Sequence, residues 1–412
     1  MTTPNSALLV LEDGVVFRGR PFGAVGDAAG ELVFNTALTG YQEAITDPSY
    51  RGQILAMTMS QIGNYGISDA DMESGGPTIA AFVCREHTRL VSNYRSDRSL
   101  HDWLASSGVP AIERIDTRAL VRHLRERGSL RAACSTRPDA EIDDLRALAR
   151  AQPLMSGCDL AGEMSTADVE PWSDSLDLSF YRGFDGLTDV PGPASGGPWR
   201  VAALDCGGKQ TIYRQLAARG CVVTRLAHDA DLEAILATEP HGLFISNGPG
   251  DPAAVAATIE TLRGLPADLP VFGICLGHQL LALARGATTY KLKFGHRGTN
   301  QPVRNLITGH IEITSQNHGF AVDEASLVAS GAEVTHLHLN DGTVAGFRDP
   351  RRPLFCVQYH PEAAPGPHES TYLFDCFVRI MRSREPLRDE DVQAARAATV
   401  VRPVGAVAEK ND

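Results

Sequence analysis

The chain has 412 residues, more than one compact domain usually holds, so two domains are expected. Hydrophobic residues make up 43% and charged residues 21%, which is typical of a globular protein, while the formal net charge of -12 disfavours a nucleic-acid partner. No apolar run approaches the ~18 residues that predict a membrane span, and residues 1–10 lack a secretory-signal pattern, so no membrane association is expected.

The first predicted domain, residues 1–160, begins with strands. Apolar residues 7–11 and 15–17 flank Glu12-Asp13-Gly14, a pattern typical of a hairpin. Further strand-like segments are residues 31–34, 53–57 and 78–84, and residues 120–125 have a helical pattern. Because strands and helices do not alternate cleanly, this domain is predicted to be mixed α and β.

A linker is predicted over residues 161–198. It ends in Pro191-Gly-Pro-Ala-Ser-Gly-Gly-Pro198, a run that cannot hold a regular helix or strand.

Residues 199–385 have the pattern of a doubly wound α/β domain. Short apolar strands alternate with helical segments, one of them capped by Asp231, which predicts a largely parallel sheet covered on both faces. The predicted strands are residues 201–204, 221–226, 242–246 and 271–274, with later strands at 311–314, 334–339, 344–347 and 354–357. Ligands bind at the carboxyl ends of strands in such folds.

The carboxyl-terminal part contains one more predicted helix and a tail. The helix, through residues 373–381, has an apolar stripe suited to packing, and Asn340-Asp-Gly342 before it predicts a hairpin. Residues 386–412, rich in Ala, Arg and acids, are predicted to form a flexible tail outside the core.

Eight cysteines are scattered along the chain without any Cys-x-x-Cys pair. This usage is typical of a reduced compartment, so a cytoplasmic location is expected. A single cysteine is most often a small buried apolar residue.

Cys275 differs from the other cysteines in its surroundings. The pattern Gly273-Ile-Cys-Leu-Gly277 follows an apolar strand and precedes a helical run, which is the form of a nucleophile elbow with sulfur as the nucleophile. A helix amino terminus favours the thiolate and offers N–H groups to an oxyanion. His360 follows another strand and is the best candidate for the base, with Glu362 to orient it.

Gly273-Ile-Cys-Leu-Gly-His-Gln279 together with His360-Pro-Glu362 resembles the class I glutamine amidotransferases that have a Cys-His-Glu triad. The resemblance implies that Cys275 attacks the side-chain amide of glutamine, that His360 passes the proton to the leaving ammonia, and that Glu362 orients the base. A glutamyl thioester then forms and is hydrolysed to glutamate.

Other segments are similar to the small subunit of carbamoyl-phosphate synthase, from about residue 7 to residue 381. They include Ser246-Asn-Gly-Pro-Gly-Asp-Pro252 and Ser315-Gln-Asn-His-Gly-Phe320, and in the first domain Phe34-Asn-Thr-Ala-Leu-Thr-Gly-Tyr-Gln-Glu43, Thr46-Asp-Pro-Ser-Tyr50, Ile62-Gly-Asn-Tyr-Gly66 and Ile115-Asp-Thr-Arg118. Sister amidotransferases for guanylate or anthranilate synthesis, or a γ-glutamyl hydrolase, do not account for these first-domain segments.

The resemblance also implies a binding site for L-glutamine. Gly248 and Leu276 would supply the oxyanion-hole N–H groups, and Ser49 would reach the substrate from the first domain. The remaining implied contacts are Gly250, Gln279, Asn317, Gly319 and Phe320. The segment Asp205–Ile212 departs from the family pattern, and we expect it to affect contacts at an interface rather than the triad.

A metal site on this chain is not expected. Cys275-x-x-His278 and His336-x-His338 have suitable residue types but lack further ligands at characteristic spacing, and His278 is expected to pack beneath the elbow. No phosphate-binding loop with its lysine is present, so ATP and its divalent metal are expected on a large partner subunit.

These observations predict the glutamine-hydrolysing subunit of a carbamoyl-phosphate synthase, which passes ammonia to a large ATP-dependent subunit. The alternative is a non-catalytic glutamine sensor or scaffold, for which a broken triad would be the expected sign. Whether the product serves arginine or pyrimidine synthesis is left open by the sequence.

Overall fold

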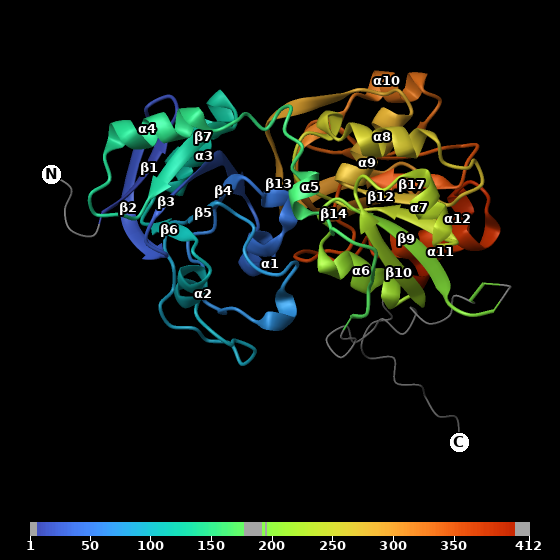
Figure 1. The fold of residues 1–412 in the computed structure, drawn as a ribbon, viewed down its shortest axis with the longest axis horizontal. Coiled ribbons are helices and arrows are strands. Elements are labelled where there is room, and N and C mark those ends of the chain that lie inside the picture. Colours follow the sequence, from blue (N-terminus) through green and yellow to red (C-terminus); the bar gives the residue numbers. More distant parts are fainter. Residues whose placement is uncertain (1–5, 177–191, 194–195, 400–412) are drawn as a thin grey trace.

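The computed structural model describes residues 6–176, 192–193 and 196–399. Figure 1 shows a blue-to-teal body with a barrel beside a larger green-to-red body with a sheet and flanking helices. No helix within these described ranges is long and apolar enough to cross a membrane.

The amino-terminal body is built around a closed barrel, with strand order β1-β2-β6-β5-β4-β3-β7. The predicted hairpin is confirmed, because β1 pairs antiparallel with β2. The strands are β1 (Ala7–Leu11), β2 (Val16–Gly23), β3 (Asp27–Asn35), β4 (Gln53–Met57), β5 (Ala81–Val83), β6 (Pro110–Glu113) and β7 (Leu130–Ser135). The helices are α1 (Tyr41–Thr46), α2 (Leu100–Ser106), α3 (Thr117–Arg127) and α4 (Ile142–Ala151).

The second body is a ten-stranded mixed sheet of order β14-β13-β15-β16-β17-β12-β11-β9-β10-β8. Neighbouring strands from β17 to β10 are parallel, as predicted for a doubly wound domain. The strands are β8 (Glu170–Pro171), β9 (Trp199–Asp205), β10 (Cys221–Ala227), β11 (Gly242–Ile245), β12 (Val271–Ile274), β13 (Thr289–Asn305), β14 (Ile311–Val322), β15 (Glu333–His338), β16 (Val344–Arg348) and β17 (Leu354–Val357).

Helices cover both faces of this sheet. Along β9, Val201 and Ala203 belong to one apolar cluster while Ala202 and Leu204 belong to another, so the strand is buried on both sides. The helices are α6 (Gln210–Ala217), α7 (Leu232–Ala237), α8 (Ala256–Arg263), α9 (Leu276–Ala284), α10 (Glu324–Ala329) and α11 (Tyr372–Ser383). The predicted cap of α7 is confirmed, because Asp231 Oδ1 accepts the Ala234 N–H at 2.8 Å.

The 17-residue strand β13 was missed by the sequence pattern. It is rich in Lys, Arg, Gly and Asn, and its ladder with β14 has two irregularities, so no apolar alternation marks it. The strand brings Arg297 opposite Asn317, and the Arg297 carbonyl accepts the Thr36 N–H from the barrel at 3.1 Å.

Two predicted irregular segments differ from the structure. Within the predicted linker 161–198, α5 (Ala161–Met164) is a helix and β8 pairs antiparallel with β10, while residues 177–191 and 194–195 lie outside the described residues. The prediction of a flexible tail from residue 386 is wrong for residues 389–399, because α12 (Asp389–Thr399) is a helix that packs on α11. Its Val392 and Ala395 are buried, but they form only a short apolar stripe that the Ala-rich composition made hard to recognise. Residues 400–412 lie outside the described part of the chain.

Candidate active site

Cys275 lies in the sharp turn between β12 and α9. Its backbone has φ 55° and ψ -100°, a conformation that residues other than glycine rarely adopt. The Cys275 N–H donates to the Val357 carbonyl at 2.9 Å, and the Cys275 carbonyl accepts the Gln279 N–H at 3.2 Å. Cys275 is therefore held in this strained conformation by bonds to β17 and α9. Backbone strain of this kind is typical of functional sites, and here the strained residue is the predicted nucleophile.

The turn depends on Gly277. A Cβ atom at this position would lie 2.4 Å from the carbonyl oxygen of Ile245, which is far inside van der Waals contact. The Gly277 N–H donates to the Ser246 carbonyl at 3.1 Å. The start of α9 can therefore pack directly against the end of β11 only when residue 277 has no side chain.

His360 and Glu362 follow β17 and lie together in the interior. His360 Nδ1 is 2.7 Å from Glu362 Oε1, and the His360 N–H donates to the Ser315 carbonyl at 2.8 Å. Since the carboxylate accepts, the proton on Nδ1 faces Glu362. The other ring nitrogen, Nε2, is buried without a hydrogen-bond partner at standard geometry.

The pKa of His360 reflects these neighbours. Burial by itself lowers it, but the charge of Glu362, the neighbouring Cys275 thiol and the hydrogen bond to Glu362 together outweigh burial and raise the pKa above its usual value. The Cys275 thiol is thus close enough to His360 to act on its protonation. The three predicted triad residues are brought together from two strand ends.

Lys209 is a fourth buried member of this group. Its Nζ lies 2.8 Å from Glu362 Oε1, with side-chain exposures of 2% and 0%. Burial by itself raises the pKa of Glu362, but the charges of Lys209 and His360 together lower it below its ordinary value. Lys209 lies in segment 205–212, so the prediction that this segment would not affect the triad is wrong. A lysine after Gly-Gly at the carboxyl end of a parallel strand was the available signal.

A narrow cavity lies beside Cys275. Of the eight residues predicted to bind glutamine, seven line it, and Leu276 directly follows Cys275 in the chain. These seven are Ser49, Gly248, Gly250, Gln279, Asn317, Gly319 and Phe320. Sequence reasoning missed other lining residues, namely Glu31, Gln53, Met155, Pro249, Arg297 and His318.

Hydrogen bonds join both bodies at this cavity. Ser49 Oγ accepts from Asn247 Nδ2 at 2.9 Å, and Asp47 Oδ2 accepts from Asn317 Nδ2 at 2.9 Å. On the other side, Gln279 Nε2 donates to the Phe320 carbonyl at 2.8 Å. Ser49 of the barrel body is thus held at the cavity of the second body by its hydrogen bond to the loop after β11, which is where its predicted contact with glutamine requires it to be.

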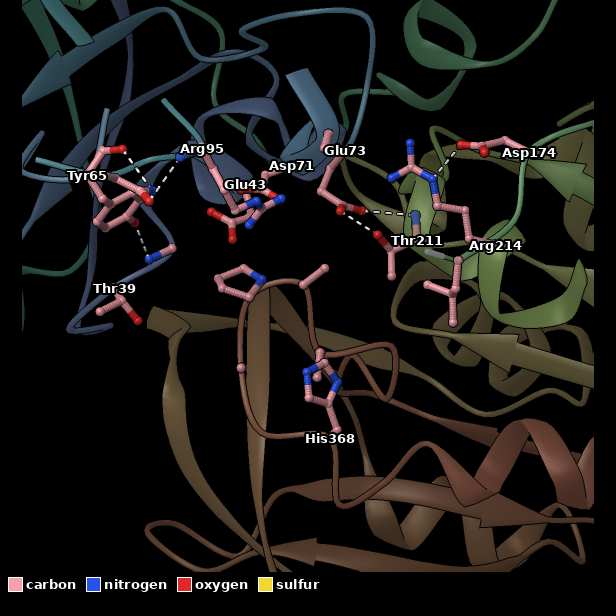
Figure 2. A pocket seen from close by; sticks show the side chains of 18 of the residues that line it. Thr39, Glu43, Tyr65, Asp71, Glu73, Arg95, Asp174, Thr211, Arg214 and His368 are labelled. Carbon is pink, nitrogen blue, oxygen red and sulfur yellow. Dashed lines mark hydrogen bonds and ion pairs between the residues drawn. The ribbon is translucent and has the colours of Figure 1, made fainter. Parts of the chain in front are cut away.

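A second cavity of about 730 Å³ lies between the two bodies (Figure 2). Glu43 and Glu73 line it from the barrel body (Figure 2), and residues 363–366, which directly follow Glu362, also belong to its lining. Glu73 accepts hydrogen bonds from Thr211, from its hydroxyl at 2.6 Å and its N–H at 3.1 Å. Burial raises the pKa of both Glu43 and Glu73 to about 7.

The histidines considered for a metal site have other partners. His278 is buried with Nδ1 3.2 Å from Cys356 Sγ, so its predicted packing beneath the elbow is confirmed. His338 lies with His296 and Asp341, and the carboxylate contacts one nitrogen of each ring. The two rings are stacked at 4.1 Å with a 12° interplanar angle, so their in-plane lone pairs cannot converge on one ion.

Comparison with known proteins gives two family matches. Residues 9–134 match "Carbamoyl-phosphate synthase small chain, CPSase domain", and residues 202–380 match "Glutamine amidotransferase class-I". The chain is 49% identical over 387 residues to the carbamoyl phosphate synthase small chain of Rhodopirellula baltica, covering 93% of this chain and 98% of the relative. It is 50% identical over 378 residues to that of Chlorobaculum tepidum, covering 91% and 97%. The chain therefore belongs to the carbamoyl phosphate synthase small chain family and carries a class I glutamine amidotransferase domain.

Proposed function

We propose that this chain hydrolyses L-glutamine at Cys275 and supplies the ammonia to a large subunit. The observation that carries the proposal is the buried group formed by the strained Cys275, His360, Glu362 and Lys209 at the end of a cavity that joins both bodies. A strained turn, an oriented base and a narrow cavity for the substrate are the parts that a thiol nucleophile needs.

The reaction begins when His360 takes the proton of the Cys275 thiol. The thiolate attacks the side-chain carbonyl carbon of glutamine, and the N–H groups of Gly248 and Leu276 stabilise the oxyanion. The carbon–nitrogen bond then breaks, His360 returns the proton to the leaving ammonia, and a glutamyl thioester remains on Cys275. Water attacks the thioester, which releases glutamate and restores the thiol.

Glu362 and Lys209 act on the base rather than on the substrate. Glu362 accepts the Nδ1 proton of His360 and so keeps Nε2 available for proton transfer. Lys209 fixes the position of that carboxylate through a 2.8 Å contact. This arrangement supports a positioning role for both residues.

The ammonia is consumed elsewhere, because a phosphate-binding loop is missing from this sequence. The large subunit would hold ATP with its divalent metal and make carbamoyl phosphate from bicarbonate. In this proposal ammonia leaves the site through the cavity in Figure 2, because the segment that directly follows Glu362 forms part of the cavity wall.

The test uses the chain purified together with its large subunit. Cys275→Ser should abolish glutamine-dependent carbamoyl phosphate formation and leave the reaction fed with free ammonia intact. Loss of both activities would indicate a structural role for Cys275, and unchanged glutamine use would favour the non-catalytic alternative.

A further inference from the structure

Glu312 on β14 is a buried carboxylate outside the cavity that contains Cys275. It is 1% exposed, and four side chains of the described part of the chain donate hydrogen bonds to it. They are Asn305, Tyr359, Ser370 and Tyr372, and none of them carries a positive charge. A carboxylate that is buried without a cation is costly, so these neutral donors have to compensate for the water that it loses.

The donors around Glu312 Oε1 are oriented by hydrogen bonds of their own. Asn305 Oδ1 accepts the backbone N–H groups of residues 307 and 308 at 2.9 and 3.1 Å, so the NH₂ of this amide faces Tyr372. Asn305 Nδ2 donates to the Tyr372 hydroxyl at 2.8 Å, and that hydroxyl donates its own proton to Glu312 Oε1 at 2.9 Å. This chain of donors therefore ends on a group that only accepts, as an ionised carboxylate does.

The other oxygen of Glu312 contacts both ends of one loop. Residues 358–371 connect β17 to α11, with Tyr359 near the beginning of the loop and Ser370 near its end. Glu312 Oε2 accepts from the Ser370 hydroxyl at 2.8 Å and from the Tyr359 hydroxyl at 3.3 Å. Together with Tyr372, the first residue of α11, these contacts join both ends of the loop to one side chain of β14. We call Glu312 with Tyr359, Ser370 and Tyr372 the loop clasp.

The clasped loop carries the predicted base. His360 directly follows Tyr359, and Glu362 follows in the same loop. The His360 N–H donates to the Ser315 carbonyl on β14 at 2.8 Å. Strand β14 therefore supports the loop twice, at Ser315 through the backbone and at Glu312 through side chains. A shift of either loop end would move the imidazole relative to the elbow.

Core packing alone does not account for a carboxylate at this position. Apolar side chains that fill the same volume are often as stabilising as buried charged groups, or more so. A carboxylate adds what apolar contacts lack, because hydrogen bonds are directional and fix the positions of the groups that donate them. Here the groups that are fixed belong to the two ends of the loop.

We propose that Glu312 is a positioning residue: the loop clasp holds residues 358–371 so that His360 stays aligned with Cys275. The inference rests on the proposed glutaminase function and adds a requirement for the activity of the base, from a side chain that does not touch the substrate. Among the described residues that line the narrow cavity beside Cys275, none belongs to this loop. Loosening the loop should therefore slow the chemical step more than it weakens the binding of glutamine.

The experiment replaces Glu312 in the complex with the large subunit. Glu312→Leu leaves the hydroxyls of Ser370 and Tyr372 buried without their acceptor. It should lower kcat for glutamine about 10- to 100-fold, since a misplacement of about 1 Å can cost 10²-fold in rate, and change KM by less than about threefold. Ammonia-dependent synthesis should be unchanged, which shows that the complex is intact. Glu324→Leu, an exposed glutamate shortly after β14, is the matched control and should keep the full kcat.

Glu312→Gln tests the hydrogen bonds apart from the charge. Its oxygen can accept from Tyr372 and its NH₂ can donate to the hydroxyl oxygens of Tyr359 and Ser370, so it should restore most of kcat. Ser370→Ala should lower kcat by itself but have no further effect beside Glu312→Leu, because its partner is then already missing. The value of kcat is expressed per Cys275 thiol alkylated by a chloroketone analogue of glutamine, so that a smaller folded fraction does not imitate a slower reaction.

An unchanged kcat per labelled thiol in Glu312→Leu, an equal loss in Glu312→Gln, or additive losses with Ser370→Ala would each overturn the inference. If Glu312→Leu does not fold, Tyr359→Phe and Ser370→Ala take its place, because each removes a single hydroxyl, and full kcat in both would overturn the inference. If instead the unaltered complex does not use L-glutamine, the proposed function itself fails. The unaltered protein therefore distinguishes the two failures.

Discussion

Lys209 Nζ and Glu362 Oε1 are 2.8 Å apart in the interior, although 153 residues separate them in the chain. The same carboxylate oxygen contacts His360 Nδ1 at 2.7 Å. Glu362 Oε1 therefore contacts both the buried ammonium of Lys209 and the imidazole of His360. The position of His360 thus depends on the ion pair between Lys209 and Glu362.

Lys209→Met should weaken both stability and catalysis. Removing one partner of a buried pair leaves an uncompensated charge, which costs about 3–5 kcal/mol. The pKa of Glu362, now held low by Lys209 and His360, would rise, so activity would be lost at a higher pH on acidification. Urea unfolding and a glutaminase pH profile measure these effects, with exposed Lys293→Met as the control. An unchanged pH profile would contradict the positioning role.

Gly277→Ala should destabilise the elbow. Alanine normally favours a helix over glycine, by up to about 1 kcal/mol. Here the added Cβ would lie 2.4 Å from the Ile245 carbonyl, so we expect a loss of about 1–3 kcal/mol, as for other overpacked sites, and a large fall in kcat. Thermal unfolding and thiol labelling of Cys275 test this. Gly264→Ala, whose Cβ would meet its nearest neighbours at 3.6 Å, should be close to neutral.

His278→Leu should flatten the acid side of the stability profile. Burial, with a smaller effect of His336, lowers the pKa of His278 to about 3 in the folded state. The unfolded chain therefore binds the proton more tightly, and stability is lost as the pH falls from about 6.5 towards 3. At pH 5 this amounts to about 2 kcal/mol for one such histidine.

The comparison is the difference in unfolding free energy between pH 7 and pH 5 for the unaltered chain and the variant. Exposed His310→Leu should keep the full pH dependence. The assignment fails if His278→Leu retains it as well.

Val392→Ser should lower the melting temperature although the residue lies near the end of the chain. Its side chain is 1% exposed and belongs to the cluster that includes α11. Replacing a buried valine removes about 1.5–3 kcal/mol of apolar burial. Ala394→Ser on the exposed side of α12 should have little effect, and equal melting temperatures for both variants would show that α12 does not pack in solution.

Much of the fold was predictable because local patterns carry it. The strands of the doubly wound sheet are short apolar runs separated by helix-length segments, and five of them were predicted in place. Closure of the barrel was not predictable, since nothing in β1 or β7 marks them as partners. The strand β13 was missed because a polar strand with irregular pairing has no apolar period.

The sequence by itself predicted the elbow at Cys275 and the candidates His360 and Glu362, because each belongs to a short motif directly after a predicted strand. The glutamine loops followed from the resemblance to a known family. Only the tertiary structure decided that Lys209 pairs with Glu362 and that Arg297 and Gln53 border the cavity beside Cys275. These positions depend on burial and on contacts that arise only when distant segments pack together, so no local pattern can encode them.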